Sequence, residues 1–213
     1  MEKSIEAIWK EGFLKNDALV APKLNNLYNQ KSKDIIDRFK RMFKINLIAI
    51  VAYSFIILMG AYFFSAIYGG IALFILLNAL VIVGKKELDN LTLIDKGVSS
   101  YQYLKAFDQW LKKVIAIYTK IYRFFYPLIF LAFALGMWYS KFGTAVLEKL
   151  KLKFPNMQVV LGMPIYGWIG IIVITIIVTI FSSKIYRWEM NVVYGRELKK
   201  LEELIADMDE LRS

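Results

Sequence analysis

The sequence predicts an all-α membrane protein in which four transmembrane helices continue into long helices that form a cytoplasmic helical bundle. Three runs contain no Asp, Glu, Lys or Arg: residues 45–84, 124–140 and 154–183. About 20 apolar residues cross the hydrocarbon core, so the first run can supply two helices and each of the others one. A mean hydropathy of +0.46 in a chain that is 22% charged indicates membrane helices combined with water-facing segments.

Residues 1–30 are expected to form a separate amphipathic segment. Its apolar residues recur at helical spacing, at Ile5, Ile8, Trp9, Phe13 and Leu14. A short helix of this kind packs on a helical bundle or lies along the inner leaflet of a membrane. A second interpretation is a docking element for a partner, in which Trp9 and Phe13 are exposed aromatic anchors.

Residues 31–66 are expected to form a cytoplasmic helix that begins near Ser32 and runs into the first transmembrane helix. Residues 67–96 contain the second transmembrane helix and its cytoplasmic extension, after a break at Gly69 and Gly70. Only the uncharged residues 71–84 follow that break, which is short for a full crossing. The second arm therefore borrows the two residues before the glycines, continues beyond the uncharged run with snorkelling side chains, or enters as a re-entrant hairpin.

Residues 97–140 are expected to form one long amphipathic helix that runs into the third transmembrane segment. Ser99 and Ser100 offer an N-cap at its start. Such a helix measures about 60 Å, half of it outside the bilayer. Its apolar residues alternate at spacings of three and four, typical of a coiled-coil seam. The seam comprises Leu104, Phe107, Leu111, Val114, Tyr118, Ile121 and Phe125.

Residues 141–163 are expected to form an extracytoplasmic loop, 164–183 the fourth transmembrane helix and 184–213 a cytoplasmic amphipathic tail. Lysines alternate with apolar residues over 149–154, which predicts an extended piece lying on the lipid headgroups. Four helices that leave the membrane together, each with an apolar stripe, predict a bundle continuous with the transmembrane one. The stripe of the tail comprises Tyr194, Leu198, Leu201, Ile205 and Met208.

Basic residues are distributed unequally over the two ends of the predicted spans. Sixteen Lys and Arg residues flank the end that carries both termini, and four flank the other end, at Lys141, Lys149, Lys151 and Lys153. Because cytoplasmic flanks are the ones enriched in Lys and Arg, both termini are expected in the cytoplasm. Attraction to an anionic inner leaflet explains the net charge of +10, so direct nucleic acid binding is not expected.

The predicted spans contain no ionisable side chain other than tyrosine. Transporters and proton relays usually place Asp, Glu, Lys or Arg near the midplane, so the spans offer little for ion or proton transport. Asn78, Thr175 and Thr179 are the candidate polar contacts, expected to hydrogen-bond between helices. Small residues every four positions, such as Ala132 and Gly136, favour close packing within the chain, with a homodimer as a second interpretation.

The chain contains no His and no Cys. Imidazole acid–base catalysis, thiolate nucleophiles, disulfides and the usual zinc sites are therefore excluded. The densest group of carboxylates, within residues 202–210, falls on the amphipathic tail, where a solvated face is expected. We accordingly expect no enzymatic activity, no catalytic residue, no metal site and no cofactor.

Five stretches carry a resemblance that extends over nearly the whole chain: IWKEGFL at 8–14, APKLNNLYNQKS at 21–32, LKAFDQW at 104–110, VYGR at 193–196 and DMDELRS at 207–213. Together they resemble an uncharacterised family of multi-pass membrane proteins, typical of the Bacteroidota and often encoded beside an ECF-type RNA polymerase sigma factor. The resemblance implies a bacterial inner (plasma) membrane location and a role as a membrane-bound anti-sigma factor. Zinc-type anti-sigma domains carry a His and Cys motif that this chain lacks, and most have one span rather than four.

Two functional hypotheses follow. The first is a non-enzymatic membrane regulator or scaffold whose cytoplasmic helices bind a soluble partner, such as a sigma factor. The second is a small transporter, a lipid-handling protein or a membrane-shaping homo-oligomer, in which the spans embedded in the lipid bilayer carry the function.

Overall fold

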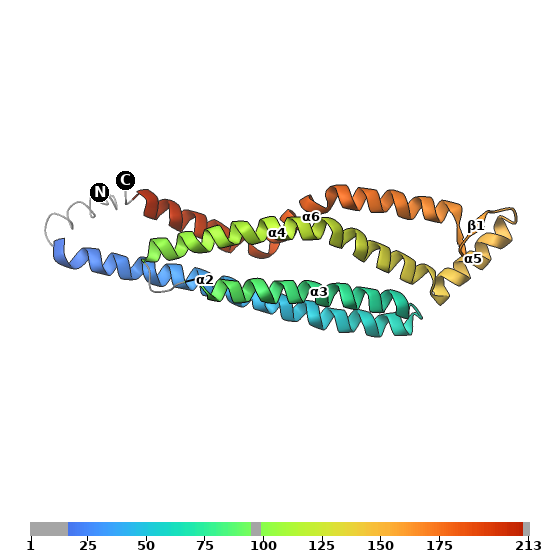
Figure 1. Cartoon of the computed structure of the whole chain (residues 1–213), viewed down its shortest axis with the longest axis horizontal. Coiled ribbons are helices and arrows are strands. Elements are labelled where there is room, and N and C mark those ends of the chain that lie inside the picture. Colours follow the sequence, from blue (N-terminus) through green and yellow to red (C-terminus); the bar gives the residue numbers. More distant parts are fainter. Residues whose placement is uncertain (1–16, 95–98, 211–213) are drawn as a thin grey trace, which may run out of the picture.

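The computed structural model describes residues 17–94 and 99–210, with side chains from Tyr28 onward. Its long helices lie side by side along one axis, and the start of α2 and the end of α6 lie at the same end of the molecule (Figure 1). A short helix and a β-hairpin form the opposite end, which we call the far end. The elements in chain order are α2 (Asp17–Phe63), α3 (Ile67–Thr92), α4 (Ser100–Trp138), α5 (Lys141–Lys153), β1 (Val159–Val160), β2 (Met163–Pro164) and α6 (Ile165–Glu210).

In the described part of the chain, four helices are long and apolar enough to cross a membrane: α2, α3, α4 and α6. The predicted all-α fold class, with four helices that could span a membrane, is therefore confirmed. Their uncharged segments, 45–84, 124–140 and 164–183, lie toward the far end and form the apolar half. The remaining parts of the same helices carry the Lys, Arg, Asp and Glu residues and form the charged half, next to the termini.

The second arm is one unbroken helix of 26 residues, α3. It measures about 39 Å, which exceeds the hydrocarbon thickness, so α3 is long enough for a full crossing. The helix starts before the glycines and continues beyond the uncharged run, as two of the three arrangements predicted. The turn between α2 and α3 lies earlier in the sequence than expected, at Ser65, which adopts φ 55°. Gly69 and Gly70 lie inside α3, where they allow close packing against neighbouring helices.

One predicted boundary at the charged end, the start of the first helix, is corrected by the structure, and the tail is continuous with the fourth span. Helix α2 begins at Asp17, well before Ser32 and before Pro22, and residues 23–31 contain no glycine or proline that would stop it. The fourth span and the tail form one helix, α6, without an interruption. Ser99 caps α4 as expected, since its hydroxyl oxygen accepts a hydrogen bond from the Gln102 backbone N–H at 3.4 Å.

The predicted extended piece in the outer loop is wrong, because residues 141–153 form helix α5. Three lysine–apolar alternations are too few to establish a strand period, and Leu147, Leu150 and Phe154 also fit a spacing of three and four. The Ser140 side chain caps α5 by accepting from the Phe142 N–H at 3.2 Å. Extended structure occurs later, in the short antiparallel hairpin of β1 and β2.

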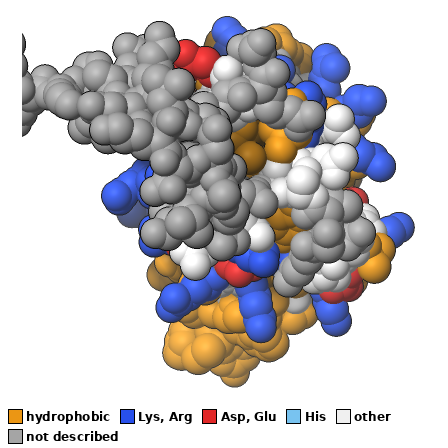
Figure 2. Space-filling model, turned by 90° about the vertical axis from the view of Figure 1, so that its left-hand side faces the viewer, with side chains coloured by type: hydrophobic (Ala, Val, Ile, Leu, Met, Phe, Trp, Pro, Cys, Tyr) orange, Lys and Arg blue, Asp and Glu red, His pale blue; other side chains and the backbone are white. Residues whose placement is uncertain are grey.

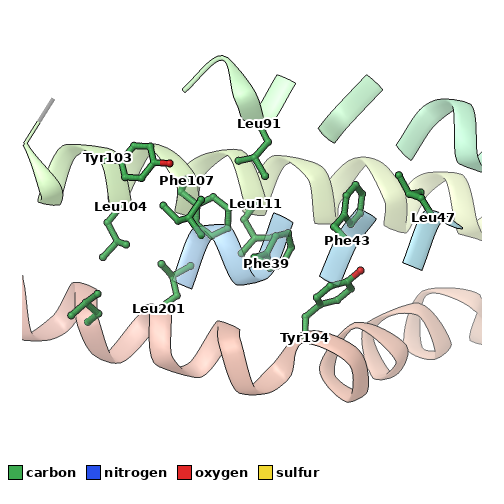
Figure 3. Close-up of a cluster of buried hydrophobic side chains, with 12 residues drawn as sticks. Phe39, Phe43, Leu47, Leu91, Tyr103, Leu104, Phe107, Leu111, Tyr194 and Leu201 are labelled. Carbon is green, nitrogen blue, oxygen red and sulfur yellow. The ribbon is translucent and has the colours of Figure 1, made fainter. Parts of the chain in front are cut away.

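The core of the charged half consists of large apolar and aromatic side chains from α2, α3, α4 and α6 (Figure 3). Phe39 is 2% exposed and lies at its centre, with ring centroids 5.4 Å from Phe107 and 4.9 Å from Tyr194. The seam predicted for α4 is confirmed, since six of its residues are buried and Ile121 is half-buried. Burial of these side chains supplies the hydrophobic stabilisation of this half.

Small residues bring the helices of the apolar half together. Gly69 of α3 meets Gly136 of α4 so closely that a Cβ on either glycine would lie 2.5 Å from the other Cα. A Cβ on Gly70 would collide with Ala61 of α2. Helices in lipid gain little from hydrophobic burial, so such backbone contacts are a main source of their association. By contrast, α6 separates from α4 toward the far end (Figure 1). Only 6% of the most apolar segment of α6 is buried within the protein.

Replacement of Gly136 by Ala is expected to destabilise the protein by about 1–3 kcal/mol, because the new methyl group must push apart two backbones. The measurement is the thermal unfolding midpoint in detergent. Gly170→Ala is the matched control, because a Cβ at Gly170 meets nothing within 4 Å. An equal or higher midpoint for Gly136→Ala than for the control would contradict the close approach.

Candidate functional site

A pocket of about 310 Å³ lies between α2 and α6 in the charged half; we call it the α2–α6 pocket. Acidic and basic side chains from both helices surround it, with Ile35 and Leu204 as apolar contacts. Seen from the terminal end, Lys and Arg side chains surround the molecule with Asp and Glu between them (Figure 2). The charged lining residues are Lys31, Asp34, Arg38, Glu197, Lys200, Glu203 and Asp207.

Glu197 is the unusual member of this lining, because it is only 8% exposed. Its Oε1 accepts a hydrogen bond from the Lys200 Nζ at 3.0 Å. Its Oε2 is buried and has no hydrogen-bond partner within the described residues. A buried carboxylate oxygen without a partner costs free energy, so Glu197 is an energetically unfavourable member of the pocket lining.

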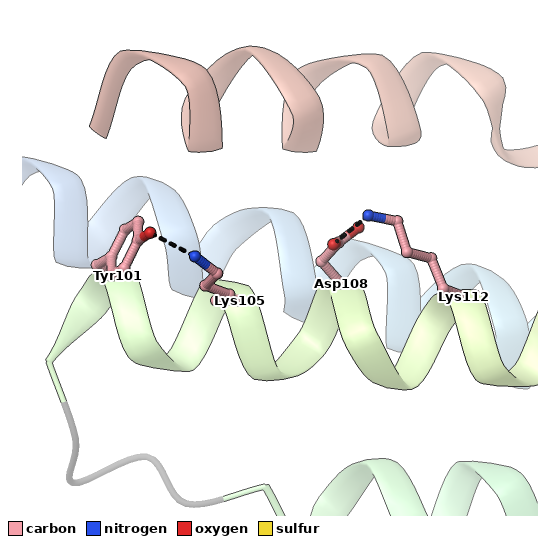
Figure 4. Close-up of polar contacts among 4 residues, drawn as sticks. All are labelled: Tyr101, Lys105, Asp108 and Lys112. Atoms are coloured by element: carbon pink, nitrogen blue, oxygen red, sulfur yellow. Dashed lines mark hydrogen bonds and ion pairs between the residues drawn. The ribbon is translucent and has the colours of Figure 1, made fainter. Parts of the chain in front are cut away.

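The C-terminal end of α6 is held against α4, away from α2. The Tyr101 hydroxyl donates to Asp209 Oδ1 at 2.6 Å and accepts from the Lys105 Nζ at 2.7 Å. Figure 4 shows the second of these bonds together with the ion pair of Lys112 and Asp108 at 2.7 Å, on the same helix. Helix α6 packs along α4 far more extensively than along α2, which leaves space between α2 and α6.

Two tyrosines in the core of the charged half, Tyr103 of α4 and Tyr194 of α6, are buried neutral groups. Burial raises the pKa of Tyr103, and the nearby Asp37 carboxylate raises it further. Burial also raises the pKa of Tyr194 to about 12, although the hydrogen bond from Asn46 opposes this shift. The Asn46 Nδ2 donates to the Tyr194 hydroxyl oxygen at 3.4 Å, which links α2 to α6 at the border of the two halves. Both phenols therefore stay protonated at neutral pH.

The structure places the sequence-predicted site residues in three different settings. Trp9 and Phe13 lie outside the described residues. Asn78 of α3 donates to Ser54 Oγ of α2 at 3.1 Å and to the carbonyl oxygen of Phe74 at 2.8 Å. The first of these bonds is the expected contact between helices, and Ser54 is fully buried beside it.

Thr175 and Thr179 do not make the expected contacts between helices. Their hydroxyls donate at 2.7 Å to the carbonyl oxygens of Ile171 and Thr175, respectively, within α6 itself. The physical reason is that α6 stands apart from α4 in this region, so the hydroxyls bond to the carbonyl one turn earlier.

Sequence reasoning missed Glu197, although a signal for it exists. Tyr194, Glu197, Leu201 and Leu204 follow a spacing of three, four and three, and all four are buried. A carboxylate within an apolar seam is a departure from the pattern that marks a special position. The tail stripe predicted from the sequence used Leu198 instead and therefore passed over the carboxylate.

Comparison with known proteins found no matching family model, no matching curated protein and no matching solved structure. The site is therefore interpreted from its own chemistry. Within the described residues, no group of three or more Asp and Glu side chains could hold a metal ion. The α2–α6 pocket offers charge pairing and hydrogen bonding, which are the chemistry of recognition.

Replacement of Glu197 by Met is expected to raise the free energy of unfolding by about 1 kcal/mol, because it removes a buried oxygen that has no partner. Urea or heat unfolding in detergent measures the change. Glu202→Met, at an exposed position of the same helix, should leave the stability nearly unchanged. A marked loss of stability in Glu197→Met would instead assign the carboxylate a structural role through Lys200.

Proposed function

We propose that the chain is a non-enzymatic integral membrane scaffold or regulator whose charged half binds a soluble protein partner at the α2–α6 pocket. The observation that carries this proposal is the buried, unpartnered Oε2 of Glu197 in a pocket lined by both signs of charge. Proteins retain such unfavourable groups where function requires them. A membrane-anchored bundle with a recognition pocket suits the capture of a partner at the membrane surface.

The proposed orientation has the charged half in the cytoplasm and the far end outside. The distribution of basic residues supports it, because the charged half contains most of the Lys and Arg residues and α5 contains only four. The resemblance to bacterial proteins supports the inner membrane as the location. The partner is then a cytoplasmic protein.

Charge complementarity specifies the group that the partner inserts. The free Glu197 oxygen pairs with an Arg or Lys side chain, and an Arg guanidinium can also bond Glu203 or Asp207 at the same pocket. Lys31 and Arg38 on the α2 wall pair with carboxylates of the partner. Because the chain resembles a family encoded beside ECF-type sigma factors, a sigma factor is the first partner to test, with the chain as its membrane-bound anti-sigma factor.

Photo-crosslinking identifies the partner directly. A benzoylphenylalanine residue at Glu203, on the rim of the pocket, should crosslink one soluble protein in intact cells, whereas the same probe at Leu152 on α5 should not. The purified partner is then titrated against the protein in lipid nanodiscs. Glu197→Gln should weaken binding by about 30-fold, since truncation of a buried charge pair costs about 2 kcal/mol or more.

Glu202→Gln is the matched control for this titration, because it removes the same charge from an exposed position that does not line the pocket. Binding by the control should equal that of the wild-type protein. Equal binding by Glu197→Gln and wild type would contradict the pocket as the docking site.

The N-terminal docking hypothesis is tested separately. Trp9→Ala or Phe13→Ala should weaken binding of the same partner without altering membrane insertion, because both remove an aromatic anchor. The same nanodisc titration measures the effect. Unchanged affinity in both variants would contradict the hypothesis that the N-terminal segment is a docking element. It would not affect the proposal that the partner binds at the α2–α6 pocket.

A further inference from the structure

A second and larger pocket, of about 830 Å³, lies at the far end, among α5, the connector that follows it and the start of α6. We call it the far-end pocket. Trp138, Leu150, Phe154 and Tyr166 supply apolar and aromatic wall, and Lys153 supplies a positive charge. Its volume lies in the range of sites that bind small molecules.

The elements around this pocket are held in place by hydrogen bonds from aromatic side chains. The Trp138 Nε1 donates to the Gly162 carbonyl oxygen at 3.1 Å, and the Tyr139 hydroxyl donates to the Leu161 carbonyl oxygen at 2.8 Å. From α6, the Trp168 Nε1 donates to the Val160 carbonyl oxygen at 3.0 Å. The β-hairpin is thus tied to the ends of both α4 and α6, so the pocket is preformed.

The position of the pocket along the molecule corresponds to a membrane–water boundary. The uncharged run that contains the end of α4 stops at Ser140, and α6, which begins directly after the hairpin, carries no charge before Lys184. Trp and Tyr side chains concentrate at such boundaries, as Trp138 and Tyr166 do here, and Tyr166 is 77% exposed. The first turns of α6 beside the pocket are exposed on their apolar side, with Ile169 at 52% and Ile172 at 55% exposure, so they can contact hydrocarbon chains of the bilayer.

The charge around the pocket is strongly positive. Residues 141–163 contain four Lys and a single Glu, and all four lysines are exposed. Lys153 lines the pocket, and its Nζ lies 5.7 Å from the centroid of the Phe154 ring. An occupant of this pocket is therefore expected to be amphipathic and to carry a negative charge.

We propose that the far-end pocket binds an anionic phospholipid from the leaflet that it faces. The phosphate group lies at Lys153, and the glycerol and upper acyl chains lie against Trp138, Leu150 and Phe154. This site is independent of the protein partner at the opposite end. It gives the chain a lipid preference in addition to its scaffold role.

The test is native mass spectrometry of the detergent-purified protein after exposure to phosphatidylglycerol or phosphatidylcholine. The wild-type protein should retain one phosphatidylglycerol and much less phosphatidylcholine. Lys153→Gln should weaken phosphatidylglycerol binding about fivefold, the effect expected for one lysine near an anionic headgroup. Lys141→Gln, which removes an equal charge from the other end of α5 and does not line the pocket, should bind as the wild type does.

Three outcomes would overturn the proposal. Equal retention of the two lipids by the wild-type protein would show that the site does not select a negative charge. Equal losses in Lys153→Gln and Lys141→Gln would show diffuse attraction to α5 and no defined pocket. Displacement of the lipid by soluble glycerol phosphate, at a concentration similar to that of the lipid, would show that the site recognises a free phosphate group and not a lipid. Because the comparison of lipids uses the wild-type protein, it holds even if a variant folds poorly.

Discussion

Backbone hydrogen bonding inside hydrocarbon is the constraint on which this architecture depends. A spanning segment in lipid must satisfy its own N–H and C=O groups, which an unbroken α-helix does. In this chain the same helices continue beyond the hydrocarbon: α2, α3, α4 and α6 each extend from the apolar half into the charged half without a break. Because the same four helices form both halves, their spacing in one half constrains their spacing in the other.

The two halves satisfy this shared geometry by different physics. In the charged half, water is the competing solvent, so large side chains such as Phe39 and Phe107 are buried between the helices. In the apolar half, lipid solvates an apolar side chain as well as another helix does, and contact at Gly69 and Gly136 replaces side-chain burial. The hydrogen bond from Asn78 to Ser54 adds a specific polar contact between α2 and α3.

The sequence was informative wherever one periodic signal determined the outcome. Uncharged runs located the spans, and the spacing of three and four in α4 identified its buried face. Local patterns whose meaning depends on the surrounding structure were interpreted wrongly. Gly69 and Gly70 suggested a turn, but they lie inside α3 and allow close packing. The alternating lysines of α5 suggested a strand, but they belong to a helix. Glu197 was missed for a different reason: the spacing of Tyr194, Leu201 and Leu204 places it in the buried seam, but the predicted stripe ran through Leu198.

Helix α6 runs without interruption from the far-end pocket to the α2–α6 pocket, over 46 residues. A helix of this length has a contour of about 69 Å, and α6 bends where it passes α4 (Figure 1). Its membrane segment contacts its neighbours little, whereas its other half packs on α4. The wall of the α2–α6 pocket that carries Glu197 and the least buried of the four candidate spans are therefore parts of one continuous helix.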